Sequence, residues 1–118
     1  MYIIRKEFHF SAAHQLEGLP ENHPCSNLHG HNYVVTIELK SKKLDNIGMV
    51  IDYRNLQPIK ELIDSSLDHK NLNDVIAFNP TAENLANYLY HQAKKIFPKV
   101  CAVEVQETPK TTARYEGS

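Results

Sequence analysis

The sequence predicts an α+β fold, in which four antiparallel strands form one sheet and two helices cover one face of it. Two observations support this prediction. Apolar and polar residues alternate in four segments, two toward each end of the chain, as they do in strands with one buried face. Between these segments, apolar residues recur at three- and four-residue spacing in two stretches, which is typical of amphipathic helices. The predicted order is therefore ββααββ.

The first two predicted strands form an antiparallel pair. The first covers residues 2–14, and a polar loop at 17–27 follows it. The second covers residues 32–40, with four apolar side chains on one face: Tyr33, Val35, Ile37 and Leu39. The long connection between the strands carries a cysteine, Cys25, and connections of this kind often hold functional residues.

The first predicted helix ends near Ser66, and its start has two interpretations. Asp52 is a good N-cap, but Pro58 conflicts with a regular helix that has already begun before it. A later start, with Asn55 as the cap, avoids this conflict. The sequence leaves both starts open.

The second predicted helix begins after Thr81, a good N-cap, and ends before Pro98. Residues 100–107 form the third predicted strand, and residues 111–115 pair back as the fourth. Alternation places four residues of the third strand on one face: Cys101, Val103, Val105 and Glu107.

Composition limits the class of protein. With 118 residues, we expect one domain, 1–118, with a modest core. The net charge is -1, and the sequence has no stripe of basic residues that would bind nucleic acid. No apolar run approaches the ~20 residues that span a membrane, and the beginning of the sequence lacks a signal-peptide pattern. We expect a cytoplasmic protein with free thiols that binds a small polar molecule, and neither nucleic acid nor a membrane.

Three histidines form a candidate metal site. His29 and His31 flank one glycine, so on an extended segment both side chains project from the same face. His14, at the end of the first predicted strand, is the third candidate ligand. Three histidines with one open position are the ligand set of a catalytic zinc site. Cys25 is either a free reactive thiol near this site or a fourth ligand that closes it.

Four separated blocks make the chain similar to a known family. They are Phe-Ser-Ala-Ala-His at 10–14, Cys-x-x-x-His-Gly-His at 25–31, Leu-Asp-His-Lys-Asn-Leu at 67–72, and Pro-Thr-Ala-Glu at 80–83 followed by Glu107. In this order they resemble the 6-pyruvoyl-tetrahydropterin synthase and 6-carboxytetrahydropterin synthase family over nearly the whole chain. The resemblance implies the tunnelling fold (T-fold), in which three subunits join their sheets into a twelve-stranded β-barrel. Two such rings stack as a homohexamer, a dimer of trimers.

The resemblance also implies roles for the residues that match the family's motifs. Three match the ligands of Zn²⁺: His14, His29 and His31. Three match the catalytic thiol and its acid–base partners: Cys25, Asp68 and His69. Three match positions that bind the pterin, the first as the anchor of its ring: Glu107, Thr81 and Glu83. Five of these residues also have a purely structural interpretation. Thr81 and Glu83 suit a helix N-terminus, Asp68 and His69 suit a turn, and Glu107 suits a charged residue on an edge strand.

The implied activity is that of a zinc-dependent lyase acting on 7,8-dihydroneopterin triphosphate. The three-residue gap between Cys25 and His29 resembles the branch that makes 6-carboxy-5,6,7,8-tetrahydropterin, with release of triphosphate and acetaldehyde, in queuosine and 7-deazaguanine biosynthesis. Gln15 stands where some bacterial relatives have a basic residue. The alternative within this chemistry is 6-pyruvoyl-tetrahydropterin synthesis, which keeps the side chain. The alternative from another class is a noncatalytic zinc- or pterin-binding module.

Overall fold

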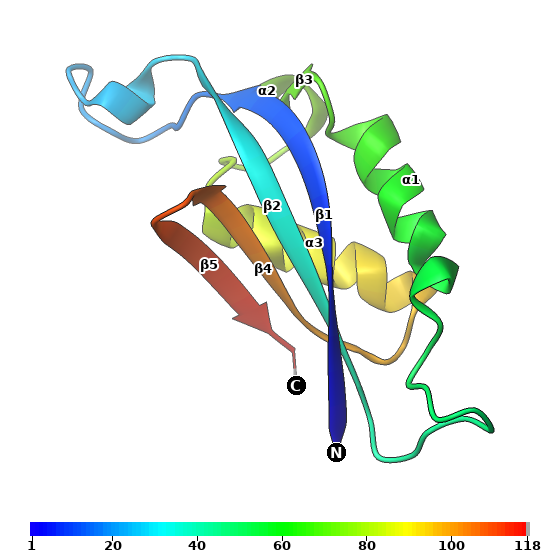
Figure 1. The fold of residues 1–118 in the computed structure, drawn as a ribbon. Coiled ribbons are helices and arrows are strands. Elements are labelled where there is room, and N and C mark those ends of the chain that lie inside the picture. The colour runs from blue at the N-terminus through cyan, green and yellow to red at the C-terminus, as the bar shows by residue number, and fades with distance from the viewer. Residues whose placement is uncertain (118) are drawn as a thin grey trace.

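The computed structural model describes residues 1–117, and its sheet contains five strands (Figure 1). Four are the predicted antiparallel strands: β1 (Tyr2–His14), β2 (His29–Ser41), β4 (Val100–Thr108) and β5 (Thr111–Glu116). The fifth, β3 (Lys70–Asn71), pairs in parallel with β1, so the sheet is mixed and has the order β3-β1-β2-β4-β5. The prediction of four strands, all antiparallel, is wrong in this respect, because a two-residue strand is too short to show an alternating pattern.

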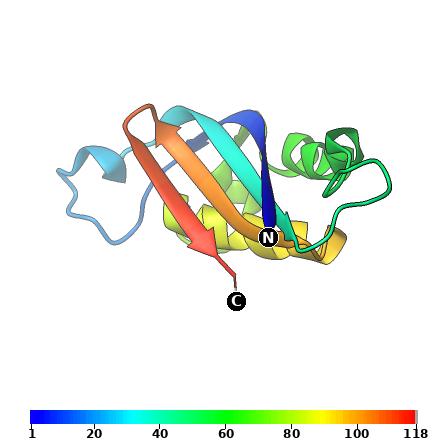
Figure 2. The ribbon, with the colours of Figure 1, turned by 60° about the horizontal axis from the view of Figure 1, so that its bottom comes forward.

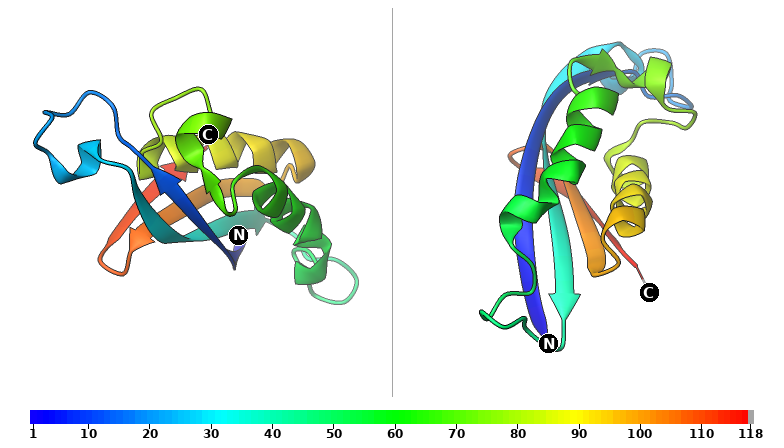
Figure 3. Two further views of the ribbon diagram at one scale, coloured as in Figure 1. Left: turned by 90° about the horizontal axis from the view of Figure 1, so that it is seen from above. Right: turned by 90° about the vertical axis from the view of Figure 1, so that its right-hand side faces the viewer.

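Two predicted helices, α1 (Gln57–Ser66) and α3 (Ala82–Ile96), lie on one face of the curved sheet (Figure 3). Between them is a four-residue helix that the sequence did not predict, α2 (Leu72–Val75). Two short 3₁₀ helices complete the described elements, η1 (Pro24–Ser26) and η2 (Tyr53–Leu56). In the described residues, no helix covers the opposite face of the sheet (Figure 2). None of the helices there has the length and apolarity that crossing a membrane requires.

The start of α1 follows from Pro58. Asp52 caps η2, because its Oδ1 accepts a hydrogen bond from the Arg54 backbone N–H at 2.9 Å. The regular helix begins only at Gln57, so Pro58 lies in its first turn, where a backbone N–H has no partner within the helix. The later start is therefore confirmed, although the N-cap is Leu56, without a side-chain cap, and not Asn55. Thr81 caps α3 as predicted, with Oγ1 accepting from the Asn84 N–H at 3.1 Å.

The core lies between the sheet and the two long helices. The predicted apolar face of β2 is fully buried, at 0% exposure for each of Tyr33, Val35, Ile37 and Leu39. Helix α3 covers this face with residues at helical spacing: Leu85, Ala86, Leu89 and Ala93. Each large apolar side chain buried here contributes about 1.5–3 kcal/mol, so this layer is the main stabilising feature.

The predicted face of β4 is interrupted by a bulge. Val100 pairs with Leu39 and Ala102 pairs with Glu38, which leaves Cys101 as the extra residue. The bulge therefore removes Cys101 from the regular alternation that predicted it on one face with Val103 and Val105. Val103 pairs with the core residue Ile37, and the core face of β4 continues from there.

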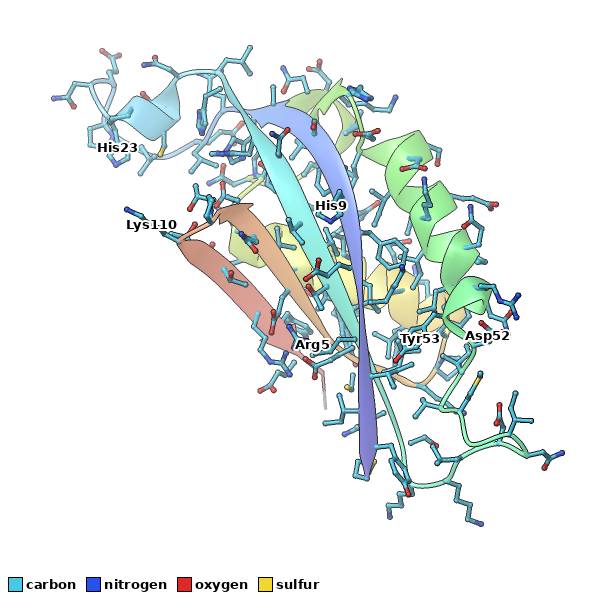
Figure 4. All side chains as sticks on the ribbon, in the orientation of Figure 1. Arg5, His9, His23, Asp52, Tyr53 and Lys110 are labelled. Atoms are coloured by element: carbon cyan, nitrogen blue, oxygen red, sulfur yellow. The ribbon has the colours of Figure 1, made fainter. Side chains whose placement is uncertain are left out.

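The open face of the sheet carries an ionic cluster, with one residue from each of the four long strands: Arg5, Glu38, Glu104 and Arg114. Arg5 reaches across β2 and donates to Glu104 Oε1 at 2.8 Å (Figure 4). Arg114 Nη2 donates to Glu38 Oε1, also at 2.8 Å, and the Glu38 side chain is only 6% exposed. The hydrogen bond from Arg114 holds the pKa of Glu38 below its usual range, with Arg5 adding to the effect.

This cluster predicts how stability depends on pH. A carboxylate whose pKa is lowered by folding stabilises the protein above its unfolded pKa, and this contribution is lost as the pH falls through the folded pKa. We expect Glu38→Gln to lower the free energy of unfolding by about 2 kcal/mol at pH 7, and by progressively less below pH 4.5, the ordinary glutamate value. Urea unfolding of both proteins between pH 7 and pH 3 measures this. A difference that does not shrink in acid would contradict the electrostatic origin.

Candidate functional site

Three imidazoles meet at one end of the sheet. β2 begins at His29, three residues earlier than predicted, so that both His29 and His31 lie on this strand. The register pairs His14 with His29 and Ala12 with His31, and residues paired in this way project from the same face. His14 Nε2 and His29 Nε2 are 3.0 Å apart, and the ligand nitrogens of all three residues lie within 4.8 Å of one another. This cluster could hold a metal ion.

Backbone carbonyl groups orient two of these rings. His14 Nδ1 lies 2.7 Å from the Pro80 carbonyl oxygen, and His29 Nδ1 lies 2.7 Å from that of Asn27. A carbonyl only accepts hydrogen bonds, so both Nδ1 atoms carry the hydrogen and both Nε2 atoms keep a free lone pair. The Tyr33 hydroxyl also lies 3.1 Å from His14 Nδ1. Such outer contacts are those that orient histidine ligands in metal sites.

Burial favours the neutral form of two of the imidazoles, those of His14 and His31. His14 is 0% exposed, and the loss of hydration lowers its pKa, an effect that the neighbouring His29 and His31 increase and the Pro80 carbonyl opposes. Burial also lowers the pKa of His31, and His29 adds to the shift. Neutral imidazole is the form that coordinates a metal, so the residues present fit such an ion.

Glu107 enters this cluster from β4. Its Oε2 lies 3.4 Å from His14 Nε2 and 3.3 Å from His31 Nε2. Burial raises the pKa of Glu107, and the negative charge of Glu83 raises it further. Two residues before it on the same strand, Val105 is fully buried, so the carboxyl group is next to an apolar wall. A group bound at the imidazoles would therefore have one carboxylate acceptor beside it.

The N-terminus of α3 borders the cluster. Thr81 follows Pro80 directly, and its side chain is used in capping the helix. Glu83, in the first turn, is exposed and close enough to influence the pKa of Glu107. The structural reading of Thr81 is thus confirmed, and both residues lie beside the site.

Cys25 lies in η1, on the loop that projects beyond the sheet; Figure 4 labels His23, the N-cap of η1, on this loop. Its thiol is free and half-buried, and its backbone N–H donates to His23 Nδ1 at 3.1 Å. Among the described residues, the group of closely spaced ligand atoms contains the three histidines and not Cys25. The geometry therefore favours a free thiol over a fourth ligand.

Asp68 and His69 are elsewhere, at the edge of the sheet beside β1. Asp68 Oδ1 accepts from the Ser11 N–H at 2.9 Å, and the His69 N–H donates to the Ser11 carbonyl at 2.7 Å. These bonds hold His69 in the left-handed region, with φ at 58°, and leave its side chain 83% exposed, 3.4 Å from Asp68 Oδ2. Within residues 1–117 no hydrogen bond or ion pair joins this pair to Cys25, and the loop carrying η1 and the strand β3 lie on opposite sides of β1 (Figures 1 and 3).

Three contacts of the site were missed by the sequence analysis. Tyr33 was assigned only to the core, although period two places it on the same face as His31, which was a usable signal. The carbonyl groups of Pro80 and Asn27 orient His14 and His29, and backbone acceptors have no sequence signature.

Comparisons with known proteins find relatives over nearly the whole chain. Residues 3–118 match the family model described as 6-pyruvoyl tetrahydropterin synthase. The chain is 37% identical to the 6-carboxy-5,6,7,8-tetrahydropterin synthase of Synechocystis sp., over 98% of this chain and 93% of the relative. It is 35% identical to the 6-pyruvoyl tetrahydrobiopterin synthase of Dictyostelium discoideum, over 98% and 95%. The solved 6-pyruvoyl tetrahydropterin synthase of Caenorhabditis elegans superposes with a TM-score of 0.87 at 30% identity, over 99% of this chain and 96% of that one.

Proposed function

This chain belongs to the 6-pyruvoyl tetrahydropterin synthase family, and from this we propose that it is a zinc-dependent lyase that makes 6-carboxy-5,6,7,8-tetrahydropterin. Its substrate would be 7,8-dihydroneopterin triphosphate, with triphosphate and acetaldehyde released. The observation that carries the proposal is the cluster of three imidazoles, with ligand nitrogens within 4.8 Å of one another, and a carboxylate beside it. We further propose that the protein works in the cytoplasm, in the pathway to queuosine and other 7-deazaguanines.

The metal of this proposal is Zn²⁺, held by His14, His29 and His31. Support comes from the donor set, since three imidazole nitrogens with a position left for substrate are typical of catalytic zinc. When bound, zinc would supply a Lewis acid that makes protons of the substrate side chain easier to remove.

The protein's own residues would then move the protons. Cys25, as a thiolate, would take a proton from the substrate side chain. His69, beside the carboxylate of Asp68, would return one. His69 is 83% exposed at the sheet edge, so we propose that it serves the site of a neighbouring subunit.

This arrangement requires an oligomer, and the open edges of the sheet support one. β3 pairs with β1 only at Ala12 and Ala13, and in the described residues β5 has only β4 as a neighbour. Exposed edges of this kind favour pairing with another chain. Contact between the β1 edge of one copy and the β5 edge of the next is heterologous and can close into a ring. We propose a trimeric barrel, stacked as a hexamer; a stable and active monomer in light scattering would rule this out.

Glu107 is the proposed anchor of the pterin ring. A pterin presents an amino group and an adjacent ring N–H, and a carboxylate can accept both hydrogen bonds at once. Glu107→Gln keeps the shape but turns one acceptor into a donor that faces donors. We expect pterin affinity to fall by about ten- to a hundredfold, or about 1.5–3 kcal/mol, with zinc content unchanged.

Isothermal titration with a pterin measures this change, and Gln106→Glu tests whether position matters as well as charge. Gln106 is the neighbouring residue on β4 and belongs to the opposite face of the strand, so the Gln106→Glu/Glu107→Gln double variant should not recover affinity. Wild-type affinity in Glu107→Gln would show that the anchor is another residue.

The product decides between the two branches of the family. The relatives include proteins named for each branch at similar identity, 37% and 35%, so identity does not discriminate. Incubation of the purified protein with 7,8-dihydroneopterin triphosphate, followed by mass spectrometry, tests the proposal. 6-Carboxytetrahydropterin with acetaldehyde supports it, a product that keeps the side chain supports the pyruvoyl alternative, and binding without turnover supports a noncatalytic module.

A further inference from the structure

Two asparagine side chains continue the edge of the sheet beyond the end of β1. The carboxamide of Asn73 makes two hydrogen bonds with the backbone of Gln15, accepting from its N–H at 2.7 Å and donating to its carbonyl at 2.8 Å. The carboxamide of Asn79 pairs with Glu17 in the same way, at 2.9 and 3.1 Å. Each carboxamide thus binds both the N–H and the carbonyl of one residue, as the backbone of a neighbouring strand would.

These pairs follow directly from the last residues of the parallel ladder. Asn71 of β3 pairs with Ala13, so residues 13, 15 and 17 all have partners on the same side. An extended chain repeats every two residues, which is why alternate residues face this edge. The backbone bonds of Gln15 and Glu17 therefore continue the edge of β1 beyond its last residue, although no strand of the described residues lies beside them.

The opposite edge of the same segment holds the turn that contains Cys25. The Leu16 N–H donates to the Cys25 carbonyl at 3.0 Å. The side-chain amide of Gln15 donates to the Ser26 carbonyl at 2.6 Å. The turn that carries Cys25 is thus hydrogen-bonded to one edge of segment 15–17, and Asn73 and Asn79 are hydrogen-bonded to the other edge.

The chain on each side of these hydrogen bonds leads directly to a candidate metal ligand, His14 on one side and His29 on the other. Gln15 follows His14 directly, and Asn79 precedes Pro80, whose carbonyl orients the His14 ring. After the turn, the Asn27 carbonyl orients His29. The position of the thiol relative to the imidazoles is therefore set by the path of residues 15–17.

We propose that Asn73 and Asn79 are positioning residues for Cys25, which fix the distance between its thiol and the histidine cluster without contacting substrate. The inference rests on the catalytic role proposed for Cys25. Without the carboxamides, residues 15–17 would exchange these bonds for water and behave as a mobile surface loop. The thiol would then spend only part of its time in the reactive position.

The expected kinetic result is specific to positioning. Displacement of a catalytic group by about 1 Å can cost up to a hundredfold in rate, so Asn73→Ala and Asn79→Ala should each lower kcat by about ten- to a hundredfold. KM and zinc content should stay at wild-type values, because the pterin site and the three histidines are retained. Asn73→Asp, which keeps the acceptor and loses the donor, should lie between Asn73→Ala and the wild type. Asn46→Ala, an exposed loop asparagine, is the matched control and should leave kcat unchanged.

A second readout needs no turnover. Hydrogen exchange followed by mass spectrometry should show faster exchange at residues 15–17 and at Cys25 and Ser26 in Asn73→Ala, but not in Asn46→Ala. Alkylation of Cys25, quantified on its own peptide to separate it from Cys101, should change in rate with the same variants. Gln15→Ala, which loses only the side-chain bond to Ser26, should loosen residues 24–26 alone.

The outcomes separate this inference from the proposed function. Wild-type exchange, alkylation and kcat in both alanine variants would overturn the positioning role. A wild-type protein that turns over no pterin triphosphate would reject the proposed function, and exchange at residues 24–26 would still decide whether the asparagines hold the turn. If the alanine variants do not fold, Asn73→Asp and Gln15→Ala give the same tests with smaller changes.

Discussion

Replacing Cys25 with alanine is expected to lower turnover of 7,8-dihydroneopterin triphosphate by about 10²- to 10⁴-fold, the range associated with loss of one proton-transferring group. Zinc content should be unchanged, because the closely spaced ligand atoms come from the three histidines. Pterin binding should also persist, since Glu107 is retained. Steady-state kinetics, elemental analysis and calorimetry measure these three quantities.

The chain provides a matched control in Cys101, a second free, half-buried thiol on the bulge of β4. Burial raises the pKa of Cys101, which disfavours the reactive thiolate, so Cys101→Ala should leave turnover unchanged. Near-normal turnover by Cys25→Ala, or equal losses in the two variants, would exclude the assigned role.

Cys25→Ala also tests whether the site is shared between subunits. If His69 serves the neighbouring subunit, co-refolding inactive Cys25→Ala with inactive His69→Ala creates sites that have both groups. With random mixing about a quarter of the sites should be intact, and activity should return to that extent. No recovery in mixed oligomers would show that Cys25 and His69 act within one chain.

Removal of one imidazole is expected to have the largest effect on metal binding. His29→Ala should weaken zinc binding by more than about a hundredfold, since changes to outer contacts alone cost ten- to a hundredfold. Its control is His9→Ala, which removes an exposed histidine of β1 that lies outside the cluster. Competition with a chelator and metal analysis after dialysis measure the difference. Full zinc retention in His29→Ala, or a zinc–sulfur bond to Cys25 in an X-ray absorption spectrum, would contradict the ligand assignment.

Local patterns predicted the long elements of this fold and failed on the short ones. The alternation from Tyr33 to Leu39 predicted the buried face of β2, and Thr81 predicted the start of α3. β3 and α2 are too short for a period to be counted; β3 pairs with the edge of β1, next to the turn at Asp68 and His69 that also binds this edge. Such long-range pairing is a property of the folded chain.

The candidate site shows the same division. His29 and His31 were predicted to share a face because their spacing matches the strand period. Their distance to His14 depends on the β1–β2 register, which a long loop does not fix, so it came only from the structure. The amide partners Asn73 and Asn79 act through backbone bonds to Gln15 and Glu17, and no sequence pattern marks them.

The strand order also has a consequence for how the chain is made. β2 is central, but its second neighbour, β4, follows only after residues 42–99. The β1–β2 hairpin can form early during synthesis, while the apolar face around Val35 and Ile37 has neither α3 nor β4 to cover it. Contacts this distant in sequence form slowly, and exposed strands favour aggregation. We therefore expect a chain truncated after β2 to be insoluble, and the full chain to depend most on chaperones before its last third is complete.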